Sequence, residues 1–206
     1  MNKGKFITLE GSEGAGKTTA IDAICEWAKN TGIETGITRE PGGTPTAEKI
    51  RELLLDKNNN AILPDTELLL MFAARAQHLR ELILPAIEQG KWIICDRFTD
   101  ATYAYQGGGR GISMERIEQL ENWVQGTFRP DLTLLLDLPV ELGLSRASMR
   151  SEPDRFELEK AAFFERVRQV YLERAKRYPQ QYRVIDASKT IEQVREQIFQ
   201  ALDEFR

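Results

Sequence analysis

"GSEGAGKTT", at residues 11–19, is the stretch from which the rest of the chain can be interpreted. Gly11, Gly14 and Gly16 stand within six residues, which lets the backbone approach a ligand closely. From Gly11 to Lys17 and Thr18 the spacing fits G-x-x-x-x-G-K-[ST], the pattern of a loop whose backbone N–H groups cradle phosphates. A chance match in a glycine-rich turn is the alternative. The strand-like run "KFITLE" before the loop and the helical pattern after it favour the phosphate-binding loop.

Five short runs are typical of β-strands, and helical periodicity separates them. The runs at 91–95 and 132–138 are almost continuously apolar, as strands buried on both faces of a sheet are. Strands that alternate with helices predict a three-layer α/β fold, with a five-stranded parallel sheet covered by helices on both faces. The predicted strands are 5–10, 33–38, 91–95, 132–138 and 182–186.

The longest helical pattern, at 65–89, contains Pro85, which we expect to kink or divide the helix at that point. A further amphipathic helix is predicted near the C-terminus, from Ile191 to Phe205. No repeat or long linker separates the chain into parts, so residues 1–206 are expected to form a single domain.

Composition narrows the class of protein. The chain has 206 residues, with 28 basic and 32 acidic side chains and a net charge of −4, which does not suggest a general nucleic-acid or membrane surface. Cys25 and Cys95 are not paired in a C-x-x-C motif, and free thiols in a reducing compartment are expected. The N-terminus has no apolar targeting segment, so the expected location is cytoplasmic.

Polar clusters follow three of the predicted strands directly: Glu10–Thr18, Arg39–Pro41 and Asp96–Arg97. Ligands of parallel α/β sheets gather at the carboxyl ends of the strands, so these clusters should meet at one edge. Asp96 could hold Mg²⁺ directly or through water, and Arg97 offers a bidentate fork for a phosphate. A surface ion pair is the alternative interpretation of these two residues.

A second basic region, "RASMRSEPDR" at 146–155, lies between helical patterns and contains a Ser-Glu-Pro-Asp break. Its arginines are typical of a lid, at about 146–157, that closes over a migrating phosphoryl group and excludes water. A solvated charged helix face is the alternative. The phosphate loop contributes no arginine, because its variable positions are Ser12, Glu13 and Ala15.

The whole chain resembles the thymidylate kinase family. The resemblance rests on five motifs in order, which are together very specific: "LEGSEGAGKTT" (9–19), "TREPGGT" (38–44), "FAARAQH" (72–78), "DRFTDATYAYQGGGR" (96–110) and "DRFE" (154–157). It implies a P-loop fold of the nucleoside-monophosphate kinase type, in which the γ-phosphoryl of ATP passes to dTMP with Mg²⁺ to give dTDP. It also implies a homodimer, to which the apolar helix 65–84 could contribute.

The resemblance assigns the donor site to the phosphate loop and the lid. Lys17 would reach the γ-phosphate, Thr18 and Asp96 would serve Mg²⁺, and Arg150 aligns best with the catalytic lid arginine of the bacterial subtype. Arg146 and Arg155 would give supporting contacts. The residues implied to hold ATP are Gly11, Ser12, Glu13, Gly14, Ala15, Gly16, Lys17, Thr18, Thr19 and Arg146.

The acceptor site is implied in the same way. Arg39 and Arg97 would hold the dTMP phosphate, and a cis peptide is expected at Glu40–Pro41. Phe72 would stack on thymine beside Arg75, which would hydrogen-bond a base carbonyl, although plain core packing is the alternative for Phe72. The remaining contacts to base and sugar are assigned to Glu13, Thr102, Tyr105 and Gln106, with Tyr105 excluding a ribose hydroxyl and Gly107–Gly109 giving that segment mobility.

Two other functions remain open at this point. A different nucleoside or nucleoside-monophosphate kinase is one, although two arginines for the acceptor favour a phosphorylated substrate. A nucleotide-dependent switch is the other, and it leaves "FAAR" and "DATYAYQGGGR" without a role. His78, the only histidine, is expected to be structural because phosphoryl transfer needs no strong general base.

Overall fold

The computed structural model describes residues 3–59, 62–149 and 155–206. Five strands form one parallel sheet in the order β2-β3-β1-β4-β5. All five predicted strands are present, with ends shifted by two residues at most. Their bounds are β1 (Phe6–Glu10), β2 (Thr35–Arg39), β3 (Trp92–Asp96), β4 (Leu132–Asp137) and β5 (Tyr182–Asp186).

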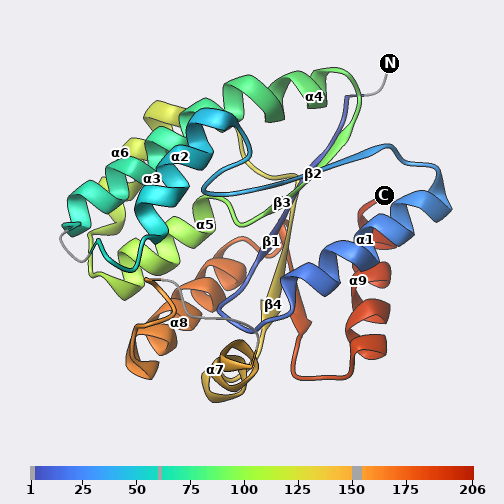
Figure 1. Ribbon diagram of the computed structural model, residues 1–206. Helices are drawn as coiled ribbons and strands as arrows, with labels where there is room; N and C mark the ends of the chain where they lie inside the picture. The colour runs from blue at the N-terminus through green and yellow to red at the C-terminus, as the bar shows by residue number, and fades with distance from the viewer. Residues whose placement is uncertain (1–2, 60–61, 150–154) are drawn as a thin grey trace.

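Helices cover both faces of the sheet, which confirms the three-layer prediction (Figure 1). On one face α1 (Lys17–Thr31) and α9 (Ile191–Phe205) pack together against the central strands. The opposite face is covered chiefly by α8 (Ala161–Arg177) and by the helices from the middle of the chain. These are α2 (Pro45–Leu55), α3 (Pro64–His78), α4 (Leu84–Glu88), α5 (Thr99–Thr102) and α6 (Met114–Gln125), while α7 (Val140–Ser148) follows β4.

The apolar cores follow from the strand pattern. β1 and β4 lie in the middle of the sheet, so nearly every side chain along them is buried, on one face or the other. Alternate residues of β4 enter different clusters: Leu134 packs with α1 and α9, and Leu135 packs with α8. Burial on both faces is the reason that β4 is almost continuously apolar, without alternation.

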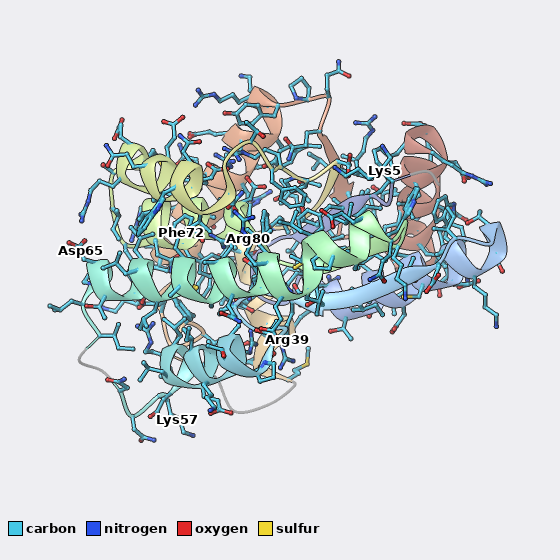
Figure 2. The ribbon with its side chains drawn as sticks, turned by 90° about the horizontal axis from the view of Figure 1, so that it is seen from above. Lys5, Arg39, Lys57, Asp65, Phe72 and Arg80 are labelled. Carbon is cyan, nitrogen blue, oxygen red and sulfur yellow. The ribbon has the colours of Figure 1, made fainter. Side chains whose placement is uncertain are left out.

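The predicted helix at 65–89 is divided, as expected, but the division begins before Pro85. α3 ends at His78, a π-helical segment follows at Leu79–Ile83, and α4 begins at Leu84. Pro85 has no N–H with which to continue the i→i−4 pattern, and the wider π-turn directly before it absorbs the interruption. The axis continues across this change, with Asp65, Phe72 and Arg80 along one rod (Figure 2).

Strand register brings the three predicted polar clusters together. Arg39 of β2 pairs with Asp96 of β3, and Leu9 of β1 pairs with Asp96 on the other side. The phosphate loop, the Arg39–Pro41 turn and Asp96–Arg97 therefore leave the same edge of the sheet, side by side. No helix in the described parts of the chain has the length and apolar content needed to cross a membrane.

Candidate active site

The phosphate loop has a conformation that requires its glycines. Gly14 has φ 70°, and a Cβ on it would lie 2.0 Å from the carbonyl oxygen of Gly143. Gly16 has φ 86° and stands as the N-cap of α1 with no side-chain cap, so the first N–H groups of the helix remain for a ligand. The loop is therefore shaped for an anion at the N-terminus of α1.

Lys17 lies over this loop, where its Nζ donates to the carbonyl oxygens of Gly11 and Ser12, both at 3.4 Å. These bonds are long, so the ammonium group can exchange them for phosphate oxygens at small cost. Burial and the neighbouring Arg97 lower the pKa of Lys17, while Asp96 and Glu13 act in the opposite direction. Thr18 is exposed in the first turn of α1.

Asp96 and Arg97 end β3 in an unusual backbone conformation. Arg97 has φ 65°, in the left-handed region that L-residues other than glycine seldom adopt, and its N–H donates to the oxygen of Leu9 at 2.9 Å. Such strain is held by the surrounding structure and is common at functional sites. Oδ1 of Asp96 is buried and has no hydrogen-bond partner within the part of the chain that the structure describes.

Glu13, Arg97 and Tyr105 form a closed triad between the phosphate loop and the segment after β3. Arg97 Nη2 donates to Glu13 Oε1 at 2.5 Å and to the Tyr105 hydroxyl at 2.9 Å, and that hydroxyl donates to the same carboxylate oxygen at 2.9 Å. Burial acts to raise the pKa of Glu13, but the charges of Arg97 and Lys17 and the bond from Tyr105 lower it to about 2. The carboxylate therefore stays ionised and holds the guanidinium in place.

A pocket opens beside this triad. It brings together most of the residues predicted to bind the acceptor, from the phosphate loop, α3 and the segment after β3. Of the predicted residues, those that line it are Glu13, Arg75, Arg97, Thr102, Tyr105 and Gln106.

Arg75 is the most enclosed cation of this pocket, with 2% of its surface exposed. Its Nε donates to Glu40 Oε2 at 2.7 Å and its Nη2 donates to Thr102 Oγ1 at 3.0 Å. Nη1 is buried and has no partner among the described residues. The peptide bond Glu40–Pro41 is cis, as predicted. A buried donor without a partner costs free energy, so Nη1 is the nitrogen left for a ligand.

Phe72 does not line this pocket. It is 2% exposed, within the apolar cluster of α3, α6 and α8, and the Arg75 guanidinium lies 4.8 Å from its ring centroid. The ring is covered by Arg75 and by the core, which agrees with the alternative of core packing, and stacking of Phe72 on thymine stays a prediction. Met71 lines the pocket instead. Its position four residues before Arg75, on the same helix face, was the signal in the sequence.

Arg39 also lies outside this pocket. It is exposed and paired with Glu48, Nη2 to Oε2 at 2.9 Å, beside a separate shallow surface that includes Asp96. Arg51 of α2 lines the acceptor pocket and donates to the oxygen of Pro41 at 2.9 Å. Burial and the charges of Arg39 and Arg97 lower the pKa of Arg51. Sequence reasoning missed Arg51, since on a helix with several charged residues nothing marks which one turns inward.

Gly107–Gly109, which were predicted to give their segment mobility, are closely packed in the structure. They lie in a π-helical segment, Tyr103–Gly109, that packs on α8. A Cβ on Gly108 would lie 2.7 Å from Cγ2 of Val170, and one on Gly109 would lie 2.3 Å from Cε2 of Phe163. These glycines are small so that two helices can approach closely.

The two described lid arginines point to different places. Arg146 donates to the oxygen of Ala187 at 2.7 Å and lines a second, larger pocket beside the phosphate loop, with Gly14, Gly16 and Thr19. Arg155 instead reaches the acceptor side, where Nη2 donates to Glu67 Oε2 at 2.6 Å and Nε to the oxygen of Leu54 at 2.8 Å. The predicted catalytic residue Arg150 lies outside the described residues.

The chain is similar in sequence and in fold to known proteins of one family. The model of the thymidylate kinase family matches residues 9–198. The chain belongs to the thymidylate kinase family. It is 61% identical over 195 residues to thymidylate kinase of Ectopseudomonas mendocina, a match that covers 95% of this chain and 93% of that relative. It is 57% identical to thymidylate kinase of Ruthia magnifica, with 96% and 97% covered.

Among solved structures, a crystal structure of thymidylate kinase from Ehrlichia chaffeensis has a TM-score of 0.79. Its sequence is 33% identical, and the match covers 98% of this chain and 99% of that one. The thymidylate kinase family consists of ATP-dependent nucleoside-monophosphate kinases, so the chain is a phosphotransferase of that class. The switch function considered above is excluded by this membership.

Proposed function

We propose that this chain transfers the γ-phosphoryl of ATP to the 5′-phosphate of dTMP, through the residues placed above. The observation that carries the proposal is the set of cations that line the acceptor pocket. Arg97, which is bonded to Glu13 of the phosphate loop, and Arg51 supply positive charge, and Arg75 presents a buried N–H without a partner among the described residues. A nucleoside monophosphate offers a matching anion in its phosphate and matching acceptors in its base carbonyls.

In the transfer, an oxygen of the dTMP phosphate forms a bond to the γ-phosphorus while the bond from that phosphorus to the leaving ADP oxygen breaks. The attacking oxygen is already an anion, so no strong base is required. Cations around the migrating group stabilise its charge. We assign this role to Lys17 from the donor side, Arg97 from the acceptor side, and Arg150 and Arg146 from the lid, with Arg39 as a further contact for phosphate.

The residues of the site could bind Mg²⁺. Asp96 offers a buried carboxylate oxygen without a partner among the described residues, and Thr18 offers a hydroxyl in the first turn of α1. A pair of oxygen ligands completed by substrate phosphates and water is the usual environment of Mg²⁺ in kinases. When bound, the ion neutralises charge on the phosphates.

We assign base and sugar selection to the other residues that line the pocket. Arg75 Nη1 is a donor and so favours a carbonyl, as thymine carries, over an amino group at the same place. Thr102, Gln106 and Met71 complete the base site. The Tyr105 hydroxyl is held by Glu13 and Arg97, so the ring cannot yield to an added ribose hydroxyl.

The test is a coupled ADP-release assay with ATP and Mg²⁺ against dTMP, dUMP, thymidine, UMP, CMP and AMP. We expect rapid turnover with dTMP and slower turnover with dUMP, since one missing methyl group is worth about 1–3 kcal/mol. Turnover with thymidine in place of dTMP would contradict the assignment of Arg97 and Arg51 to a phosphate.

We also propose that the active form is a homodimer in the cytoplasm. Of the helix 65–84, Leu68 and Phe72 are buried within the chain, while Leu69 is 56% exposed. Trp123 of the neighbouring α6 is 81% exposed. Exposed apolar residues on adjacent helices support association through this side of the molecule. Light scattering of the purified chain at working concentration, with a monomer mass as the contrary result, tests it.

A further inference from the structure

His78 is a buried polar residue that the chemistry above does not use. It is the only histidine of the chain, ends α3 and has 0% of its surface exposed. Its Nε2 lies 2.6 Å from Thr38 Oγ1 and its Nδ1 lies 3.0 Å from Glu40 Oε1. The imidazole therefore joins α3 to the end of β2 and to the turn that follows it.

Glu40 connects His78 to Arg75, which lines the acceptor pocket. One carboxylate oxygen meets His78, and the other accepts from Arg75 Nε at 2.7 Å. Thr102 accepts from Nη2 of the same guanidinium. Because a guanidinium is planar and rigid, holding two of its nitrogens sets the direction of the third. That third nitrogen is Nη1, which has no hydrogen-bond partner among the residues that the structure describes.

The turn at 40–43 is built closely around the imidazole. Gly43 has φ 86°, and a Cβ on it would lie 2.4 Å from His78 Nε2 and 2.5 Å from Thr38 Oγ1. A side chain at this position would break the His78–Thr38 bond. The glycine thus leaves room for the imidazole between Thr38 and Glu40.

We propose that His78 is a positioning residue for base selection. It fixes the Glu40 carboxylate, which fixes Arg75 so that Nη1 is aimed at the carbonyl opposite the sugar on the acceptor base. It does not touch the substrate. The inference rests on the proposed function, because it requires a pyrimidine nucleotide in this pocket. This series of contacts from His78 through Glu40 to Arg75, the relay, should therefore favour dTMP over dCMP, which carries an amino group in place of that carbonyl.

Two substitutions separate the contact of His78 with Glu40 from its contact with Thr38. In His78→Asn the amide nitrogen replaces Nδ1 and keeps a donor toward Glu40, while the Thr38 contact is lost. In His78→Gln the amide group reaches the place of Nε2 and keeps Thr38, while Glu40 loses its donor. Both variants remove the imidazole, so each is the control for the other.

The measurement is kcat/KM for dTMP divided by kcat/KM for dCMP. For His78→Gln we expect this ratio to fall about tenfold, mainly through a higher KM for dTMP, with the KM for ATP unchanged. For His78→Asn we expect a ratio within about twofold of the unsubstituted chain. An unchanged ratio in both variants, or an equal fall in kcat for both acceptors, overturns the relay.

A second measurement needs no variant, and so decides the matter if either variant fails to fold. The single imidazole gives one set of ¹⁵N signals in the full chain. Saturation with dTMP should shift the Nδ1 signal, and saturation with dCMP should shift it less. Equal shifts overturn the relay. Absence of dTMP turnover in the unsubstituted chain defeats the proposed function itself, whereas turnover with an unchanged ratio defeats the relay alone.

Discussion

Glu13 of the phosphate loop and Arg97 at the end of β3 are joined by a 2.5 Å bond between Oε1 and Nη2, although 84 positions separate them in the chain. The bond links the donor side of the site to the acceptor side. It also restrains a residue whose backbone is in the left-handed region. A guanidinium held in this way needs little reorganisation when a phosphate binds.

The Glu13–Arg97 pair makes the free energy of unfolding depend on pH. The pKa of Glu13 in the folded chain, about 2, lies below its ordinary value of 4.5. Its contribution to the free energy of unfolding is therefore fully present above pH 4.5 and is lost as the pH falls toward 2. We expect this contribution to be about 3 kcal/mol. Thermal melts of the unsubstituted chain and Glu13→Gln should differ at neutral pH and converge as the pH falls through this window. A constant difference in Tm would contradict the ionised pair.

Met71 and Phe72 provide a matched pair on one helix. Met71→Ala should raise the KM for dTMP about tenfold and leave the KM for ATP unchanged, because it removes an apolar wall of the acceptor pocket. Phe72→Ala should lower the free energy of unfolding by about 3–5 kcal/mol, because it leaves a cavity in the core. Steady-state kinetics and urea unfolding of both variants check this. A stable Phe72→Ala with poor dTMP binding, beside an unaffected Met71→Ala, would support the predicted stacking of Phe72 on thymine.

The lid arginines should differ in which kinetic parameter they affect. Arg150→Ala should lower kcat about 10³-fold if it stabilises the migrating phosphoryl group. Arg155→Ala should instead raise the KM for dTMP, because Arg155 is bonded to Glu67, which also accepts from Gln106 of the acceptor pocket at 2.7 Å. Single-turnover rates with saturating dTMP separate the two effects. A larger loss of kcat in Arg155→Ala than in Arg150→Ala would reverse the assignment.

Tyr105 should govern the choice of sugar. Tyr105→Ala should raise kcat/KM for UMP relative to dUMP, because it removes the ring that we propose faces the sugar. Tyr105→Phe keeps the ring but loses the bonds to Glu13 and Arg97. For Tyr105→Phe we expect a UMP-to-dUMP ratio of kcat/KM that lies between those of the unsubstituted chain and Tyr105→Ala. The UMP-to-dUMP ratio in the same coupled assay checks this. Equal ratios for the unsubstituted chain and the two variants would contradict a role of Tyr105 in sugar selection.

Local patterns in the chain were sufficient to predict the architecture and the outline of the site. Glycine spacing, apolar runs and helical periodicity are properties of short segments, and they place Lys17 after β1 and Asp96 at the end of β3. Because parallel strands end at one edge of a sheet, the meeting of these segments followed without knowledge of any contact.

Which side chains line the pocket depended on packing between segments far apart in the chain. Met71 and Phe72 are neighbours on α3, but only Met71 lines the pocket, because Arg75 and the core cover Phe72. Arg51 turns into the pocket while Arg39 pairs with Glu48 at the surface. One helical residue step rotates a side chain by about 100°, so the phase of α3 against its neighbours, which no short segment encodes, determined the lining of the site.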